Sequence, residues 1–442
     1  MDMHASTMRR TPRLHERDDG LMMTDCMLIG ALFLAAVWVL DPLHIGLDRL
    51  TLVKHLPLLA LAGTLVLVAT GRALLPRPPV APMAGVAETL WPFILFGVAV
   101  LLGSLYGRFV DGVENSFLNM GLFMMVAPAL AWLMLTAAHP ARLARGFFIA
   151  LGCAAAGVGV LQWANFAGDT FFHGTEFAVI PMAAYCWFAF KPGFMRLAGA
   201  AFFLSLAPAE HKNTGFLLAI MVVAYCGYWS VRARYRAARD GMARERQIGW
   251  AAFMAGGLVL LGLSFYALRK LLLPDGNPQY RLHTYEKALD KFFASPIFGN
   301  WFTGPATERF ELFQVAVSTS NVLPTHSDPL DILANGGMLY ALVFLCGIWR
   351  VLRLTLGALN HAETSAAPEC APALHGCVVI FISGILVYAF NPVLTQPNSA
   401  LIYWAATGMG VGLALRMRAI KPAAATAAGA FGTTARVVPG ER

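Results

Sequence analysis

Among the polar residues of the segment Leu271–Gly336, Arg281 and His326 are of types that could bind an anion and accept a proton. An arginine guanidinium is a rigid fork of N–H donors that stays charged and suits phosphate oxygens. An imidazole has a pKa of about 6.5, so it can accept a proton near neutral pH. The sequence on either side of the segment decides where these two residues are held.

The composition of the chain is that of a helical membrane protein. Of the 442 residues, 58% are hydrophobic and only 13% are charged, whereas soluble domains carry roughly 25% charged residues. A bilayer core requires about 20 apolar helical residues per crossing. We therefore predict an all-α polytopic fold with about twelve spans, at 22–40, 52–70, 90–106, 117–138, 146–166, 174–190, 194–209, 214–231, 248–270, 337–357, 374–391 and 398–416.

The distribution of Lys and Arg predicts the orientation. With a cytoplasmic N-terminus, 23 of the 33 Lys and Arg residues fall on the inner side, including the block Arg232–Arg246. This bias is the one that bacterial inner-membrane proteins show, so both termini are expected in the cytoplasm. The chain then divides into an N-terminal arm (1–21), spans one to nine (22–270), a periplasmic loop (271–336), spans ten to twelve (337–416) and a disordered tail (417–442). The dispersed positive charge does not indicate nucleic-acid binding.

The periplasmic loop is patterned like folded, helical protein. Pro278–Phe293 predicts an amphipathic helix, and Ala306–Val317 predicts a second one. A third helix is expected to begin at Asp328-Pro329, with Asp328 as its cap and Pro329 in its first turn. The apolar side of the first helix consists of Leu282, Tyr285, Leu289, Phe292 and Phe293.

The loop resembles the O-antigen ligase and O-antigen polymerase superfamily of bacterial envelope glycosyltransferases. The matching text is Arg281, then Ser295-Pro296-Ile297-Phe298-Gly299-Asn300, then Pro324-Thr325-His326-Ser327 through Asn335-Gly336-Gly337. Members typically have an Arg, a "P-x-x-G" turn, and a His followed by "G-G" before the next span. The resemblance is close over this loop, and the number of spans is broadly similar to that of the superfamily.

The resemblance implies transfer of a glycan from undecaprenyl diphosphate to lipid A–core, without a cofactor and without a metal. Arg281 would hold the leaving diphosphate and His326 would take the proton of the incoming hydroxyl. Further outer-face cations for the diphosphate are Lys212, Arg269 and Arg108, and possible orienting carboxylates are Glu176 and Glu210. Lys212 stands where the family usually has Arg, and Glu176 where it more often has Asn.

Each of these residues also has a purely structural interpretation. His326 could cap the following helix, Arg281 could pair with Glu286, and Lys212 could extend to the headgroups. Two other functions stay open: a polymerase or protein O-oligosaccharyltransferase of the same superfamily, and a lipid or polysaccharide transporter. A transporter would place charged residues inside its spans, whereas here they collect at span ends.

Overall fold

The computed structural model describes residues 63, 82–113, 117–137, 139–164, 175–209, 213–237, 277–309, 322–324, 327–362, 365 and 367–419. The predicted spans 22–40, 52–70 and 248–270 lie outside these residues, as do the N-terminal arm and residues 420–442 of the tail. The other nine predicted spans fall on described helices.

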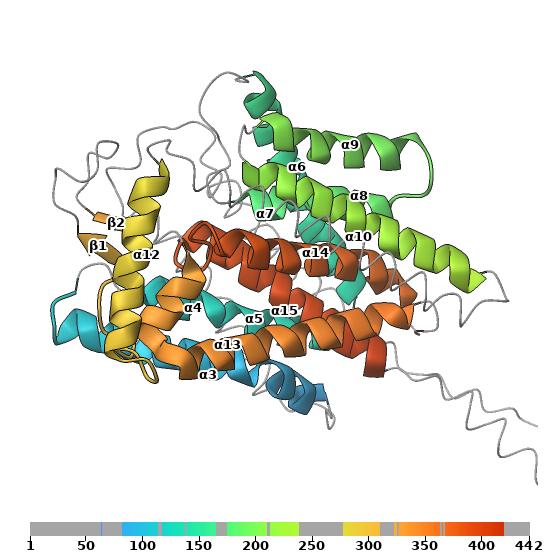
Figure 1. Ribbon diagram of the computed structural model, residues 1–442. Coiled ribbons are helices and arrows are strands. Elements are labelled where there is room, and N and C mark those ends of the chain that lie inside the picture. Colours follow the sequence, from blue (N-terminus) through green and yellow to red (C-terminus); the bar gives the residue numbers. More distant parts are fainter. Residues whose placement is uncertain are drawn as a thin grey trace, which may run out of the picture.

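The described part is helical except for one short pair of strands (Figure 1). Its helices α3–α10 are α3 (Pro82–Phe109), α4 (Leu118–Met124), α5 (Val126–Thr136), α6 (Pro140–Ala164), α7 (Glu176–Val179), α8 (Met182–Ala189), α9 (Phe194–Ala209) and α10 (Asn213–Ala237). They are followed by α12 (Asn277–Ala294), β1 (Thr307–Arg309), β2 (Val322–Pro324), α13 (Asp328–Asn360), the 3₁₀ turn η4 (Pro368–Cys370), α14 (Ala371–Tyr388) and α15 (Pro397–Ala419).

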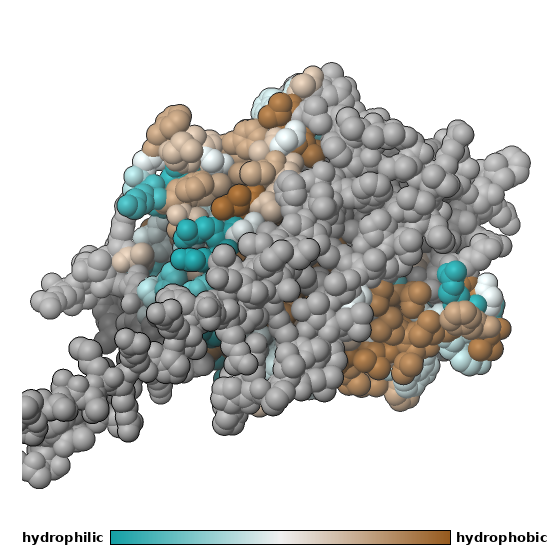
Figure 2. All heavy atoms as spheres, turned by 180° about the vertical axis from the view of Figure 1, so that it is seen from behind, coloured by the Kyte–Doolittle hydropathy of each residue, from teal (hydrophilic) through white to brown (hydrophobic). Residues whose placement is uncertain are grey.

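Several of these helices are long and apolar enough to cross a bilayer. Seven of them qualify in the described part of the chain: Ala84–Phe109, Leu118–Thr136, Pro140–Ala164, Thr214–Ala233, Asp328–Asn360, Pro368–Tyr388 and Ser399–Arg418. The apolar helices Glu176–Ala189 and Phe194–Ala207 are shorter, and they coincide with the predicted spans 174–190 and 194–209. The molecule is therefore a helical membrane protein, and broad apolar areas lie on the face seen in Figure 2.

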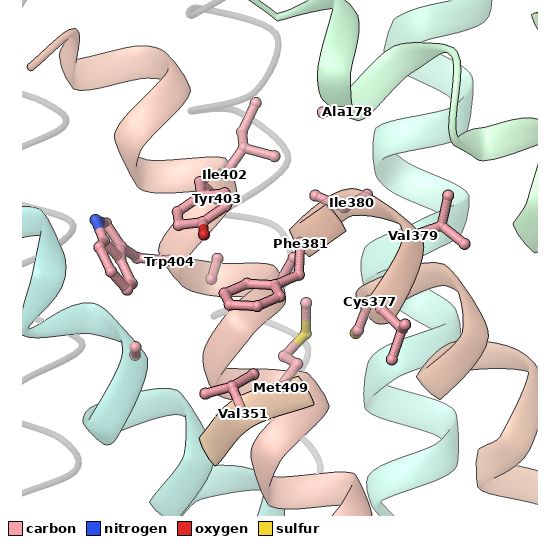
Figure 3. Packing of buried hydrophobic residues seen from close by; sticks show 14 of the residues in the cluster. Ala178, Val351, Cys377, Val379, Ile380, Phe381, Ile402, Tyr403, Trp404 and Met409 are labelled. Atoms are coloured by element: carbon pink, nitrogen blue, oxygen red, sulfur yellow. The ribbon is translucent and has the colours of Figure 1, made fainter. Parts of the chain in front are cut away.

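The centre of the bundle is α15, which is buried along most of its length. Tyr403 stacks on Phe381 of α14 with ring centroids 5.4 Å apart (Figure 3). Trp404 meets Phe93 of α3 edge to face, with ring centroids 4.9 Å apart. On another side, Gly408 lies so close to the Ala127 carbonyl of α5 that a Cβ would not fit. Small residues at such crossings let helix backbones approach closely, which is how membrane helices gain packing energy.

Helix α13 is broken at Gly337, where φ is 65° and ψ is −173°. The break removes helical partners from the backbone around it, and a segment that we call the clasp (Ser295–Thr303) replaces them. Met338 N–H donates to the Pro296 carbonyl at 2.8 Å, and Leu339 N–H donates to the Ile297 carbonyl at 3.1 Å. Phe302 N–H in turn donates to the Asn335 carbonyl at 3.2 Å. The clasp thus completes the backbone hydrogen bonding that the broken helix lacks.

The two strands overturn part of one prediction. Residues 307–309, expected to open a helix over 306–317, form a strand antiparallel to β2, with Thr307 opposite Pro324 and Arg309 opposite Val322. The helical periodicity was a local signal, and pairing with a segment more than ten residues away supplies the backbone partners instead. Residues 310–317 lie outside the described part. The ladder connects the end of the clasp to the start of α13.

Replacing Gly337 with Ala is expected to destabilise the fold. A Cβ there would lie 2.5 Å from the Ile297 carbonyl oxygen and 2.7 Å from the Gly299 nitrogen. The backbone conformation alone costs a non-glycine residue about 1–3 kcal/mol. The melting temperature in detergent, followed by tryptophan fluorescence, should fall. Gly227→Ala is the control, because a Cβ on this helical glycine meets nothing within 4 Å; equal melting temperatures for the two variants would contradict the analysis.

Candidate functional site

Helix α12, which carries Arg281, packs against α13 (Figure 1). Thr284 and Ala288 are buried on the same side of α12, and Arg281 is half-buried beside them. The Thr284 hydroxyl donates to the Arg281 carbonyl at 2.8 Å. The predicted bounds of this helix, 278–293, are confirmed within one residue at each end.

Most of the predicted apolar side of α12 is not covered by the described part of the chain. Leu282, Leu289 and Phe293 are exposed, and the face toward α13 carries Arg281, Thr284 and Tyr285. The reason lies in α13, whose first turns present polar side chains that an apolar face could not satisfy. Periodicity correctly grouped Leu282, Leu289 and Phe293, but it also assigned Tyr285 to their side, and it could not say which face meets protein.

The first two turns of α13 bury three polar side chains, Asp328, Asp331 and Asn335, spaced so that they share one face of the helix. None of them was a predicted site residue. The only signal in the sequence was the helical spacing of polar residues directly after His326. Burial of three such groups at one helix end is unusual, because each must be compensated by hydrogen bonds or charge.

Asp328 does not act as the expected helix cap. Ser327 occupies the N-cap position, and the Asp328 side chain points elsewhere, toward the connection between α14 and α15. Its Oδ2 atom accepts hydrogen bonds from the Val393 and Leu394 N–H groups, both at 2.7 Å. The carboxylate therefore ties this connection to α13, and it also interacts electrostatically with Tyr388 and Tyr403.

Asn335 joins α13 to the clasp. Its Nδ2 atom donates to the Asp331 carbonyl at 3.0 Å, while its carbonyl group receives the Phe302 N–H. The Asn300 side chain lies close by, since both Asn300 and Asn335 line the space beside Gly304. The Asn300 Oδ1 atom accepts from Phe302 N–H at 3.1 Å, so this N–H is shared between the Asn300 side chain and the Asn335 backbone carbonyl.

Tyr285 reports the electrostatics between the two helices. Burial raises the pKa of its phenol, the Arg281 cation lowers that pKa, and the Asp331 carboxylate raises it. The phenol therefore lies within electrostatic range of both charges. The Arg281 cation, the Asp331 carboxylate and the half-buried Tyr285 phenol thus form a polar seam between α12 and α13.

The other predicted residues are distributed more widely. Arg108 is exposed in the last turn of α3, and this end of α3 abuts the clasp, because Gly103 and Gly107 pack on the carbonyls of Trp301 and Thr303. Glu176, by contrast, opens α7 and is fully buried; α7 packs against α14, α10 and α6. His326, Lys212, Glu210 and Arg269 lie outside the described residues.

Most of the residues in which the sequence resembles the superfamily belong to the clasp or contact it. Pro296 supplies a carbonyl to α13, and Gly299 has a positive φ of 60° and packs directly on the Asn335 backbone. Gly337 is the break itself. These motif residues are explained by backbone geometry, so Arg281 is the described motif residue that is left for chemistry.

Comparison with known proteins adds no family. No family model matches the chain, and a search of curated proteins finds no match. In the described part of the chain, no group of three or more His, Cys, Asp or Glu residues is placed to hold a metal ion.

Loss of the Asp328 carboxylate is expected to destabilise the protein. Asp328→Ala leaves two buried N–H donors without an acceptor, and each costs about 1–3 kcal/mol. Thermal denaturation in detergent should show a lower melting temperature, partly restored in Asp328→Asn, which keeps one acceptor oxygen. Asp290→Ala is the control, because this carboxylate is exposed on α12. If Asp328→Ala melts with the control, the bonds to Val393 and Leu394 contribute nothing.

Proposed function

We propose that the protein is a membrane glycosyltransferase of the O-antigen ligase type, which transfers a polysaccharide from undecaprenyl diphosphate to lipid A–core. It would act at the periplasmic face of a bacterial inner membrane, with twelve spans and both termini in the cytoplasm. The observation that carries the proposal is the meeting of the motif segments at one place. Arg281, the Pro296–Gly299 turn and the Gly336–Gly337 break all converge on the start of α13.

Arg281 is suited to hold the diphosphate. It is half-buried on a helix that packs on α13, so its stem is fixed, and within the described part of the chain its buried Nε atom has no hydrogen-bond partner. A phosphate oxygen would satisfy this donor, and a fixed guanidinium stabilises the charge that develops on a leaving diphosphate. The Asp331 carboxylate near Tyr285 would orient the guanidinium from the other side.

His326 directly precedes Ser327, the N-cap residue of α13. In the proposed reaction its imidazole takes the proton of an acceptor hydroxyl, whose oxygen forms a bond to the anomeric carbon. The bond from that carbon to the phosphate oxygen breaks, and the electron pair leaves with the diphosphate. One displacement of this kind inverts the anomeric centre. Lys212, Arg269 and Arg108 would add cationic charge for the diphosphate, and Glu176 and Glu210 would orient neighbouring groups.

The proposed activity predicts the behaviour of two variants. Purified protein in liposomes, given carrier-linked O-antigen and lipid A–core, should form the joined product. Arg281→Ala should lower the rate by about 10²–10³, as loss of a charge-stabilising donor does, and His326→Ala by about 10²–10⁴, as loss of a general base does. Arg353→Ala is the control, since this exposed arginine lies in the C-terminal half of α13.

The outcomes of this assay separate the related activities. Wild-type transfer together with unimpaired Arg281→Ala and His326→Ala would refute the assigned roles. Chain growth on the carrier in place of transfer would identify a polymerase, and transfer to a protein would identify an O-oligosaccharyltransferase. No transfer to any of these acceptors would exclude the proposal.

A metal-free reaction is expected, because cations of the chain itself would neutralise the diphosphate. Transfer by the wild-type protein should therefore be unchanged after treatment with EDTA. A sample restored only by Mg²⁺ or Mn²⁺ would show that the metal, and not Arg281, supplies the main charge stabilisation.

A further inference from the structure

The outward side of α12 carries an apolar stripe that no described part of the chain covers. Leu282, Leu289 and Phe293 are 57%, 39% and 71% exposed. Their spacing of seven and four residues places them in one line along the helix. Glu286 and Asp290 are exposed beside this line, so the outer side of α12 is half apolar and half acidic.

The clasp extends the apolar stripe. Ile297, Phe298 and Trp301 are 60%, 46% and 51% exposed, and the rings of Phe298 and Trp301 stack with centroids 5.8 Å apart. Because Ile297 bonds to the backbone of Leu339, its exposed side chain adjoins the exposed Met338 and Leu339 of α13.

This surface is continuous with the outer faces of two membrane-crossing helices. On α13 the exposed apolar residues follow helical spacing from the break onward, as Met338, Leu342, Leu345 and Trp349. On α3, whose end packs on the clasp, they are Leu102, Leu105, Tyr106 and Phe109. Soluble proteins rarely expose large apolar patches, and here the exposed apolar residues of α12 and the clasp adjoin those of the two membrane-crossing helices.

Helix α12 also has the direction of a helix that lies on a membrane. Figure 1 shows it crosswise to α3 and α13, at the end of the bundle where α13 begins. If the long helices cross the bilayer, a helix crosswise to them at their ends lies in the plane of the headgroups. Helices with one apolar and one charged side adopt this position, and Trp and Tyr are enriched at the same depth.

We propose that α12 and the clasp are seated in the lipid headgroup region, with Leu282, Leu289, Phe293, Ile297, Phe298 and Trp301 in contact with the bilayer. The stripe faces the acyl boundary, and Glu286 and Asp290 face water. Arg281, on the side toward α13, is then held at the depth of lipid phosphates. This proposed membrane contact rests only on the exposure of the apolar side chains and on the direction of α12. It therefore does not depend on which reaction the protein catalyses.

Photocrosslinking to lipid tests whether α12 contacts the bilayer. The photoreactive residue p-benzoylphenylalanine is introduced at Phe293 or Leu289 of the full chain, and at Asp290 as the matched control. Leu289 and Asp290 are neighbours in sequence but point about 100° apart around the helix. The purified proteins are reconstituted in phosphatidylethanolamine–phosphatidylglycerol vesicles, irradiated and analysed by mass spectrometry. Equal melting temperatures for the variants establish that each is folded.

The Phe293 and Leu289 variants should form about tenfold more lipid adduct than the Asp290 variant, as an interfacial helix with its apolar side in lipid requires. Equal lipid adducts from all three positions would overturn the proposal. Adducts from Phe293 to a second copy of the chain, in place of lipid, would also overturn it and would identify the stripe as a protein interface. Neither result depends on the transfer assay. A failure of the proposed membrane contact can therefore be distinguished from a failure of the proposed reaction.

Discussion

The break in α13 at Gly337 is the constraint on which this end of the molecule depends. A helix interrupted near a bilayer must find new partners for the backbone groups it releases, because hydrocarbon offers none. The clasp supplies them through Pro296, Ile297 and Phe302. The clasp can approach this closely only because Gly299 and Gly337 have no side chains. Backbone hydrogen bonds thereby fix the segment after α12 to the beginning of a spanning helix.

From this junction the positions of the functional groups follow. Helix α12 ends directly before the clasp, so anchoring the clasp also sets where α12 lies and which side it turns toward α13. At the same end of α13, Asp328 fixes the connection between α14 and α15 through two short hydrogen bonds. Two segments distant in sequence, α12 with the clasp and the connection between α14 and α15, are thus held at the start of α13. Rigidity of this kind is what the proposed site for a charged leaving group would require.

The sequence predicted the features that local patterns determine. Apolar runs located nine spans that fall on described helices, periodicity gave α12, and Asp328-Pro329 gave the start of α13. Three features depend on neighbours that no local pattern contains. The strand at 307–309 needs β2, the carboxylate of Asp328 needs backbone donors 65 and 66 residues away, and the buried face of α12 is chosen by the polar start of α13. Periodicity separates two faces but does not say whether lipid or protein covers each one.

The exposed apolar stripe and the polar seam both follow from the way α12 is oriented around its axis. A water-soluble protein would bury Leu282, Leu289 and Phe293 and expose Arg281, since apolar burial outweighs a surface charge. At a membrane boundary the preference reverses, because lipid accepts the apolar side at no cost and the protein can use its own polar groups to compensate an arginine. The observed orientation of α12 is therefore the one that a neighbouring bilayer favours. In the proposed reaction, the same orientation would hold the Arg281 guanidinium at the depth of a membrane-bound diphosphate.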